Sequence, residues 1–164
     1  MTDETHAAEA RRYFEQGYRA QMEQRIDEAI ALYAKSIEAR PTAEAHTFLA
    51  WAISAQRRLD EAIAHCRTAI ELDPDFGNPY NDIGAYLIEL GRPDEAIPWL
   101  ERAMRAPRYE PRHFPHLNLA RVYILQNRLP EAIRALQAVL AIEPAHAGAR
   151  AQIRELHRRL AALN

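Results

Sequence analysis

The tetrapeptide Asp27-Glu28-Ala29-Ile30 decides the fold, because it returns at regular intervals along the chain. It recurs as Asp60–Ile63, as Asp94–Ile97 and, with proline in place of aspartate, as Pro130–Ile133. The four alanines lie 33, 34 and 36 residues apart. A return at that period is the signature of stacked structural repeats. Its acidic residues fall in the expected first turn of a helix, where negative charge offsets the helix dipole.

The composition indicates one soluble globular domain. The chain has 164 residues, of which 48% are hydrophobic and 27% are charged. That is enough to bury a core, and too apolar for a disordered chain. The formal net charge of −2 gives no general attraction to nucleic acid or to anionic membranes. We therefore expect neither nucleic acid nor a membrane among its partners.

Signals for export or membrane insertion are missing from the sequence. The acidic start, Met1–His6, does not resemble a secretory signal, and no run of about 18 apolar residues is long enough to span a bilayer. The single cysteine, Cys66, has no partner for a disulfide within the chain. These observations favour a cytoplasmic protein.

Proline and glycine divide the chain into helix pairs. Pro41, Pro74 and Pro144 end three of them, because proline cannot continue a helix, and Gly91 suits a left-handed turn between two helices. The segment Pro107–Arg112 lengthens the third period and is interpreted as a longer surface loop. No stretch has the alternation of a strand, so the expected fold is all-α. The expected organisation is a disordered tail over residues 1–6 and a single domain over 7–164, with repeats at about 10–42, 43–76, 77–112 and 113–146 and a capping helix at about 147–163.

Aligning the four units on their repeated alanine shows which positions share a residue type. Twelve residues before the alanine lies a small residue, four residues before that lies a ring, and four residues after the alanine lies a core residue. The small residues are Gly17, Ala50, Gly84 and Ala120, the rings are Tyr13, His46, Tyr80 and His116, and the core residues are Tyr33, Cys66, Leu100 and Leu136. Two helices that cross closely leave little room beyond a Cβ atom, so glycine or alanine is expected at each crossing.

This pattern resembles the tetratricopeptide repeat (TPR), in which an aromatic residue, a Leu-Gly pair, a tyrosine, an alanine, a second aromatic residue and a proline recur within about 34 residues. The resemblance covers residues 10–146. It implies a TPR-type α-solenoid of antiparallel helix pairs, coiled into a right-handed superhelical arc, with the final helix as its polar cap. It also implies a non-catalytic module that binds other proteins.

No constellation of residues points to catalysis or to a cofactor. The sequence has no phosphate-binding glycine loop and no nucleophile elbow. His113 and His116 are spaced to share a metal ion, with Glu110 three residues earlier. However, Pro111 places Glu110 in the loop, and His116 fills a ring position of the repeat. Cys66 occupies a core position. We expect no enzymatic activity, no metal and no cofactor.

In proteins with this repeat, the first helices of successive pairs line a concave groove that binds an extended peptide or a partner's helix. Residues outside the packing stripe of these helices are expected to face the groove. Exposed aromatic side chains are typical of interaction sites, and polar groups can hold a peptide backbone. The predicted site comprises Phe14, Tyr18, Phe48, Trp51, Asn81, Asp82, Phe114, Asn118 and Arg121. Alternatively, the aromatic side chains pack against each other or against the N-terminal segment.

The leading hypothesis is an adaptor that binds a segment of a partner protein. An apolar or aromatic segment would dock against Phe48 and Trp51, while Asn81, Asp82 and Asn118 hydrogen-bond its backbone. The alternative is a homo-oligomeric scaffold that associates through the aromatic face. The expected state is therefore a monomer or a weak homo-oligomer.

Chaperone-binding members of the family hold a C-terminal carboxylate with basic groove residues. The resemblance places Phe14, Tyr18, Phe48, Asn78 and Asp82 at the corresponding positions. None of these side chains is basic, and Asp82 would repel a carboxylate. Chaperone binding of that kind is therefore not expected.

Overall fold

The computed structural model describes residues 2–163, and these residues form nine α-helices and no strand. The only pairing of extended backbone in this part of the chain is an isolated bridge between Phe76 and Arg108. The all-α prediction is confirmed. The helices are α1 (Asp3–Met22), α2 (Ile26–Ala39), α3 (Ala43–Ala55), α4 (Leu59–Leu72), α5 (Asn78–Glu89), α6 (Pro93–Arg105), α7 (Phe114–Leu125), α8 (Leu129–Ile142) and α9 (Ala147–Ala161).

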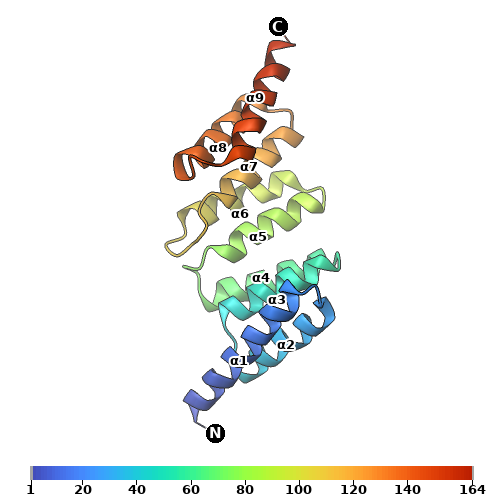
Figure 1. Ribbon diagram of the computed structural model, residues 1–164, viewed down its shortest axis with the longest axis vertical. Coiled ribbons are helices and arrows are strands. Elements are labelled where there is room, and N and C mark those ends of the chain that lie inside the picture. Colours follow the sequence, from blue (N-terminus) through green and yellow to red (C-terminus); the bar gives the residue numbers. More distant parts are fainter. Residues whose placement is uncertain (1, 164) are drawn as a thin grey trace.

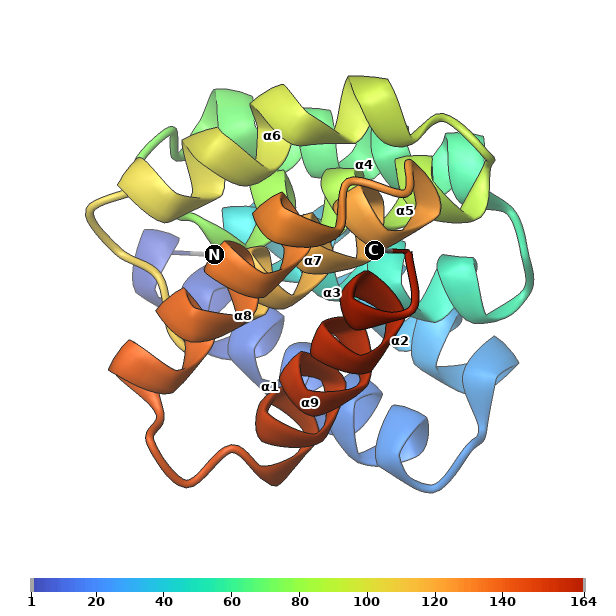
Figure 2. The ribbon, with the colours of Figure 1, turned by 90° about the horizontal axis from the view of Figure 1, so that it is seen from above.

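The helices stack in chain order as four pairs with α9 at the end. Each helix packs mainly against the helices before and after it, and α1, α3, α5 and α7 also contact one another in sequence. The stack is elongated, with the two ends of the chain at opposite ends of the molecule (Figure 1). Seen along the stack, α3 and α7 lie near the middle and α6 lies at the edge (Figure 2). This arrangement is a solenoid.

The turn inside each pair uses one residue with a positive φ angle. Gln24, Arg57, Gly91 and Asn127 have φ values of 62°, 63°, 74° and 55°. The left-handed turn predicted at Gly91 is confirmed, and the other three units form the same turn with residues that carry a Cβ atom. The acidic residues of the repeated tetrapeptide lie in the first turn of α2, α4, α6 and α8, as expected. In each unit the arginine that directly precedes the second helix forms an ion pair with the glutamate in the first turn of that helix. The pairs are Arg25–Glu28, Arg58–Glu61, Arg92–Glu95 and Arg128–Glu131.

Glycine is required where the two helices cross in the first and third pairs. A Cβ atom added at Gly84 would lie 2.5 Å from Leu100 Cδ2, and one added at Gly17 would lie 2.8 Å from Tyr33 Cδ1. Leu100 and Tyr33 are both fully buried. The predicted close crossing is therefore confirmed, and the core side chain of the second helix lies directly on the backbone of the first.

The prediction of a disordered tail over residues 1–6 is wrong for the residues that the structure describes. The hydroxyl of Thr2 accepts a hydrogen bond from the Thr5 backbone N–H, and α1 begins at Asp3. Asp3 and Glu4 place negative charge in the first turn, where the helix dipole favours it. Met1 lies outside the described residues.

The last helix, α9, covers the end of the stack. It packs on α8 and buries Ala149 and Leu156, whereas Arg150, Arg154 and Arg158 are exposed to solvent. A polar outer face is what the end of a repeat array needs. Within residues 2–163, no helix is long and apolar enough to cross a membrane.

A histidine pair in the second unit makes stability sensitive to acid. The rings of His46 and His65 are stacked, with their Nδ1 atoms 3.2 Å apart. Burial lowers the pKa of both imidazoles, and the neighbouring His65 adds to the effect at His46. A group whose pKa is lowered by folding binds its proton more readily in the unfolded chain. The free energy of unfolding is therefore expected to fall as the pH drops below about 6.5.

The substitution His65→Gln tests this expectation. It removes one half-buried imidazole, so the variant should lose less stability than the natural protein between pH 7 and pH 5, as measured by urea unfolding. His157→Gln, on the exposed surface of α9, is the matched control and should leave the pH dependence unchanged. Equal pH dependence of the natural protein and His65→Gln would contradict the assignment.

Candidate functional site

A pocket of about 490 Å³ opens where the first helices of the four pairs face one another. Its lining comes from α1, α3, α5, the start of α7 and the loop between α6 and α7. The lining residues are Tyr18, Thr47, Phe48, Trp51, Asn78, Asn81, Asp82, Tyr109, Pro111 and Phe114. Most of this surface is aromatic or amide, with one carboxylate.

The aromatic side of the pocket is a connected group of rings centred on Phe48. The centroid of the Phe48 ring lies 5.1 Å from that of Phe14 in an edge-to-face arrangement, and 5.9 Å from the ring centroids of Tyr18 and Trp51. Phe14 and Phe48 also pack against the core cluster. Tyr18, Trp51 and Phe114 instead remain 45%, 43% and 43% exposed. The rings therefore pack against each other and still present an apolar surface to solvent.

The polar side of the pocket is a chain of side-chain hydrogen bonds. Asn118 Nδ2 donates to Asn81 Oδ1 at 2.9 Å, and Asn81 Nδ2 donates to Asp82 Oδ1 at 3.5 Å. The Asp82 carboxyl is partly buried, and desolvation raises its pKa to about 7. The hydrogen bond from Asn81 opposes this rise without overcoming it. Asn118 therefore orients Asn81, which in turn faces the carboxylate.

The loop between α6 and α7 forms one wall of the pocket. The Gly77 N–H donates to the Arg108 carbonyl at 2.8 Å, and Asn78 Nδ2 donates to the Glu110 carbonyl at 3.5 Å. These bonds hold the loop against the start of α5 and bury Tyr109. A Cβ atom added at Gly77 would lie 2.5 Å from Tyr109 Cβ, so only glycine leaves room for this ring.

Six of the nine residues predicted for the site line the pocket, and three do not. Phe14 lies beneath Phe48, Asn118 contacts the pocket through Asn81, and Arg121 lies on the exposed surface of α7. The six in the lining are Tyr18, Phe48, Trp51, Asn81, Asp82 and Phe114. Four other residues complete the lining: Thr47 and Asn78, which lie on α3 and α5, and Tyr109 and Pro111, which belong to the loop between α6 and α7 and were missed by the sequence. The only signal for the two loop residues was the 36-residue spacing of the third period, with an aromatic residue in the added loop.

Two family models, both described as tetratricopeptide repeat, match residues 14–75 and 75–145. Together they span the four helix pairs from the middle of α1 to the end of α8. The chain belongs to the tetratricopeptide repeat family. No curated protein sequence matches this TPR chain.

Solved structures share the fold of this TPR protein. PilF from Pseudomonas aeruginosa superposes with a TM-score of 0.89 at 20% identity, over 96% of this chain and 72% of PilF. PilW, a type IV pilus biogenesis factor, gives a TM-score of 0.79 at 22% identity, over 85% of this chain and 64% of PilW. YrrB, described as a TPR protein with an unusual peptide-binding site, gives 0.66 at 21% identity, over 90% of this chain and 75% of YrrB. At these identities the likeness establishes the fold alone.

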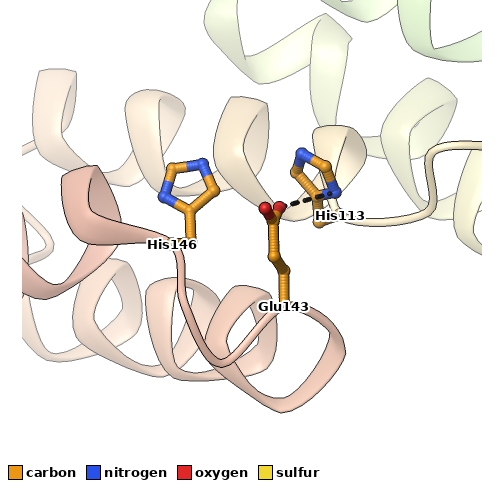
Figure 3. A group of neighbouring side chains, drawn as sticks. All are labelled: His113, Glu143 and His146. Carbon is orange, nitrogen blue, oxygen red and sulfur yellow. Dashed lines mark ion pairs between the residues drawn. The ribbon is translucent and has the colours of Figure 1, made fainter.

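A second group of ionisable side chains lies in the last repeat of the TPR array, where α7, α8 and α9 meet. His113 precedes α7, Glu143 follows α8 and His146 precedes α9. The side chains point toward one another, with the carboxylate between the two rings (Figure 3). His113 Nδ1 lies 3.4 Å from Glu143 Oε2, and one ligand atom from each of the three residues lies within 4.8 Å of the others. The sequence pointed instead to His116 and Glu110 as neighbours of His113.

The role of His146 at the start of α9 opposes metal binding by this group. Its Nδ1 accepts the Ala149 backbone N–H at 3.0 Å and so caps the helix. A neutral imidazole that accepts through Nδ1 carries its proton on Nε2, which then has no lone pair for a metal ion. Metal binding would therefore remove the cap. We assign the group to joining α7, α8 and α9.

Cys66 is also a structural residue. It is fully buried in the core cluster that runs from α1 to α7. Burial raises the pKa of its thiol well above the ordinary range. A buried thiol held in its protonated form is a poor nucleophile.

Proposed function

We propose that this chain is a non-catalytic interaction module, an adaptor that binds an extended segment of a partner protein in the pocket. The observation that carries the proposal is the group of exposed rings, Tyr18, Trp51 and Phe114, around a hollow of about 490 Å³. Large aromatic side chains left in solvent beside a concavity are enriched at binding sites. The YrrB structure, described as having a peptide-binding site, supports peptide binding as a function of this fold.

The polar lining favours a bound segment in an extended conformation rather than a helical one. An extended peptide presents unpaired backbone N–H and C=O groups, whereas a helix has already satisfied most of its own. Asn78 and Asn81 bring amide groups to the same pocket as the rings. Because Asn81 is buried and bonded to Asn118 and Asp82, we expect Asn78 to hydrogen-bond the backbone while the rings hold apolar side chains.

Selection of short peptides from a random display library, followed by fluorescence anisotropy, tests the proposal. Trp51→Ala is expected to weaken binding of the selected peptides at least about tenfold, because truncating a central aromatic contact typically costs more than about 1 kcal/mol of binding free energy. Leu72→Ala is the matched control, since Leu72 is 47% exposed on α4 and outside the pocket. It should bind within about twofold of the natural protein.

Self-association through the aromatic face is the competing function. Sedimentation velocity over a range of concentrations separates the two, and the proposal predicts a monomer throughout. A dimer that disappears in Trp51→Ala would contradict the adaptor and favour the scaffold. Failure to select any peptide that depends on Trp51 would also overturn the proposal.

A further inference from the structure

The pocket contains one ionisable carboxyl and no basic side chain. Asp82 is the only acidic residue in the lining, which includes no lysine, arginine or histidine. Within residues 2–163, Asp82 forms no ion pair, whereas many exposed carboxylates of the chain are paired with arginine. Among the described residues, its only hydrogen bond between side chains is the 3.5 Å contact from Asn81. The carboxylate therefore faces the pocket without a cation.

The rings that line the pocket also differ from five other rings of the described chain, each of which has a basic side chain over its face. Elsewhere in the described chain, basic side chains lie over ring faces. These pairs are Arg12 and Lys35 with Tyr13, Arg67 with Trp99, Arg102 with Tyr80 and Trp99, Arg108 with Phe76, and Arg128 with Tyr123. None of the five rings that line the pocket has such a partner within residues 2–163. A carboxylate and several ring faces at one hollow are the groups that attract an organic cation.

We propose that the pocket receives a lysine or arginine side chain from the bound segment, with its charged end at Asp82 and its alkyl stem between the pocket rings. The inference rests on the proposed function and adds the class of residue that is recognised. Long basic side chains suit this shape because they combine an apolar stem with a cationic end. An acidic segment is excluded by the same carboxylate, so the pocket discriminates by charge as well as by shape.

Asp82 is the group in the pocket whose charge changes near neutral pH, because the pKa values of its ionisable neighbours lie well above that range. Cys66 from α4, Tyr86 from α5 and Tyr109 from the loop face it, and burial raises the pKa of each. α1 contributes the Tyr18 phenol to the lining, and α3 and α7 contribute no ionisable side chain. Glu89, which lies beyond Tyr86, is paired with Arg57.

Charge at Asp82 should therefore control binding of a basic segment. Desolvation raises the pKa of this carboxyl to about 7 in the free protein. A cation binds the ionised form, so affinity should increase as pH rises through this value. Between pH 6 and pH 8 the ionised fraction increases about tenfold, and the affinity for a basic peptide should increase by a similar factor.

The experiment uses the same display library on the natural protein and on Asp82→Asn. Lysine or arginine should be enriched at one position of the peptides selected on the natural protein, and this enrichment should be lost on Asp82→Asn. In anisotropy, replacing the enriched residue by norleucine, which keeps the stem and removes the charge, should weaken binding at least about tenfold. Asp82→Asn should weaken binding of the basic peptide to a similar extent, and the affinity should no longer depend on pH between 6 and 8. Asp82→Glu should retain most of the affinity.

The outcomes separate this inference from the proposed function. Peptides that depend on Trp51 but carry no enriched basic residue would overturn the inference and leave the peptide-binding proposal intact. So would basic enrichment that is equal on the natural protein and on Asp82→Asn, since the cation would then bind elsewhere. If no peptide depends on Trp51, both proposals fail.

Discussion

Leu100→Ala is expected to lower the free energy of unfolding by about 2–5 kcal/mol, because it removes a fully buried side chain from the middle of the stack. Leu100 belongs to the core cluster that extends from α1 to α7 and lies directly against the backbone of α5 at Gly84. Neighbouring helices cannot close the gap without breaking their own contacts, so a cavity should remain. Urea unfolding at pH 7.5, followed by circular dichroism, measures the loss.

Leu125→Ala is the matched control for this prediction. The same chemical change at a side chain that is 61% exposed on α7 should alter stability by less than about 0.5 kcal/mol. Gly84→Ala supplies a sharper test. Alone it should destabilise, because its Cβ would lie 2.5 Å from Leu100 Cδ2, but in the Leu100→Ala background it should stabilise. Additive effects of the two substitutions would contradict the assigned contact.

The sequence predicted the scaffold well because the scaffold is repeated. Small residues at the helix crossings and acidic residues in the first turn occur in several units, so each unit independently supports the same assignment. Gly84 and Leu100 are correct examples, since their spacing from Ala96 places them in contact. The start of α1 was missed although its signals were present: Thr2 as a capping residue, followed by Asp3 and Glu4.

The site was predicted less completely because it depends on what does not repeat. Periodicity selects residues that face a groove, and it found Trp51 and Asp82, which line the pocket. It could not place Tyr109, because the path of an added loop depends on hydrogen bonds such as the one from Gly77 to Arg108. The expected hydrogen bond between Asn118 and a partner's backbone stays a prediction, and within the chain Asn118 donates to Asn81 of the preceding repeat.

Asp82→Asn is expected to stabilise the free protein at pH 8 by about 1–4 kcal/mol, even though it should weaken the binding of basic segments at least about tenfold. Desolvation raises the pKa of Asp82 from 3.8 to about 7. A tenfold change in an acid dissociation constant corresponds to about 1.4 kcal/mol, so burying the charge costs at most about 4 kcal/mol. Water in the open pocket screens the charge and reduces this value. Asparagine has a similar shape and carries no charge.

The pH dependence fixes the sign of this prediction. Between about pH 4 and pH 7 the unfolded chain loses the Asp82 proton while the folded protein keeps it, so folding becomes less favourable as pH rises. The advantage of Asp82→Asn should therefore be small at pH 4, grow up to about pH 7 and remain constant above it. Every other ionisable group is the same in the two proteins, so its contribution cancels in the difference. Urea unfolding of both proteins at several pH values measures it.

Lower stability of Asp82→Asn at pH 8 would mean that the free protein already satisfies the carboxylate, and the cation proposal would lose its physical basis. The opposite result would identify a residue that weakens the fold and strengthens binding. In that case the basic peptide should raise the unfolding temperature of the natural protein more than that of Asp82→Asn, because stabilisation by a ligand increases with the logarithm of its affinity for the folded state. A carboxylate without a cation is unfavourable in the isolated scaffold, and a bound basic side chain would remove that unfavourable contribution.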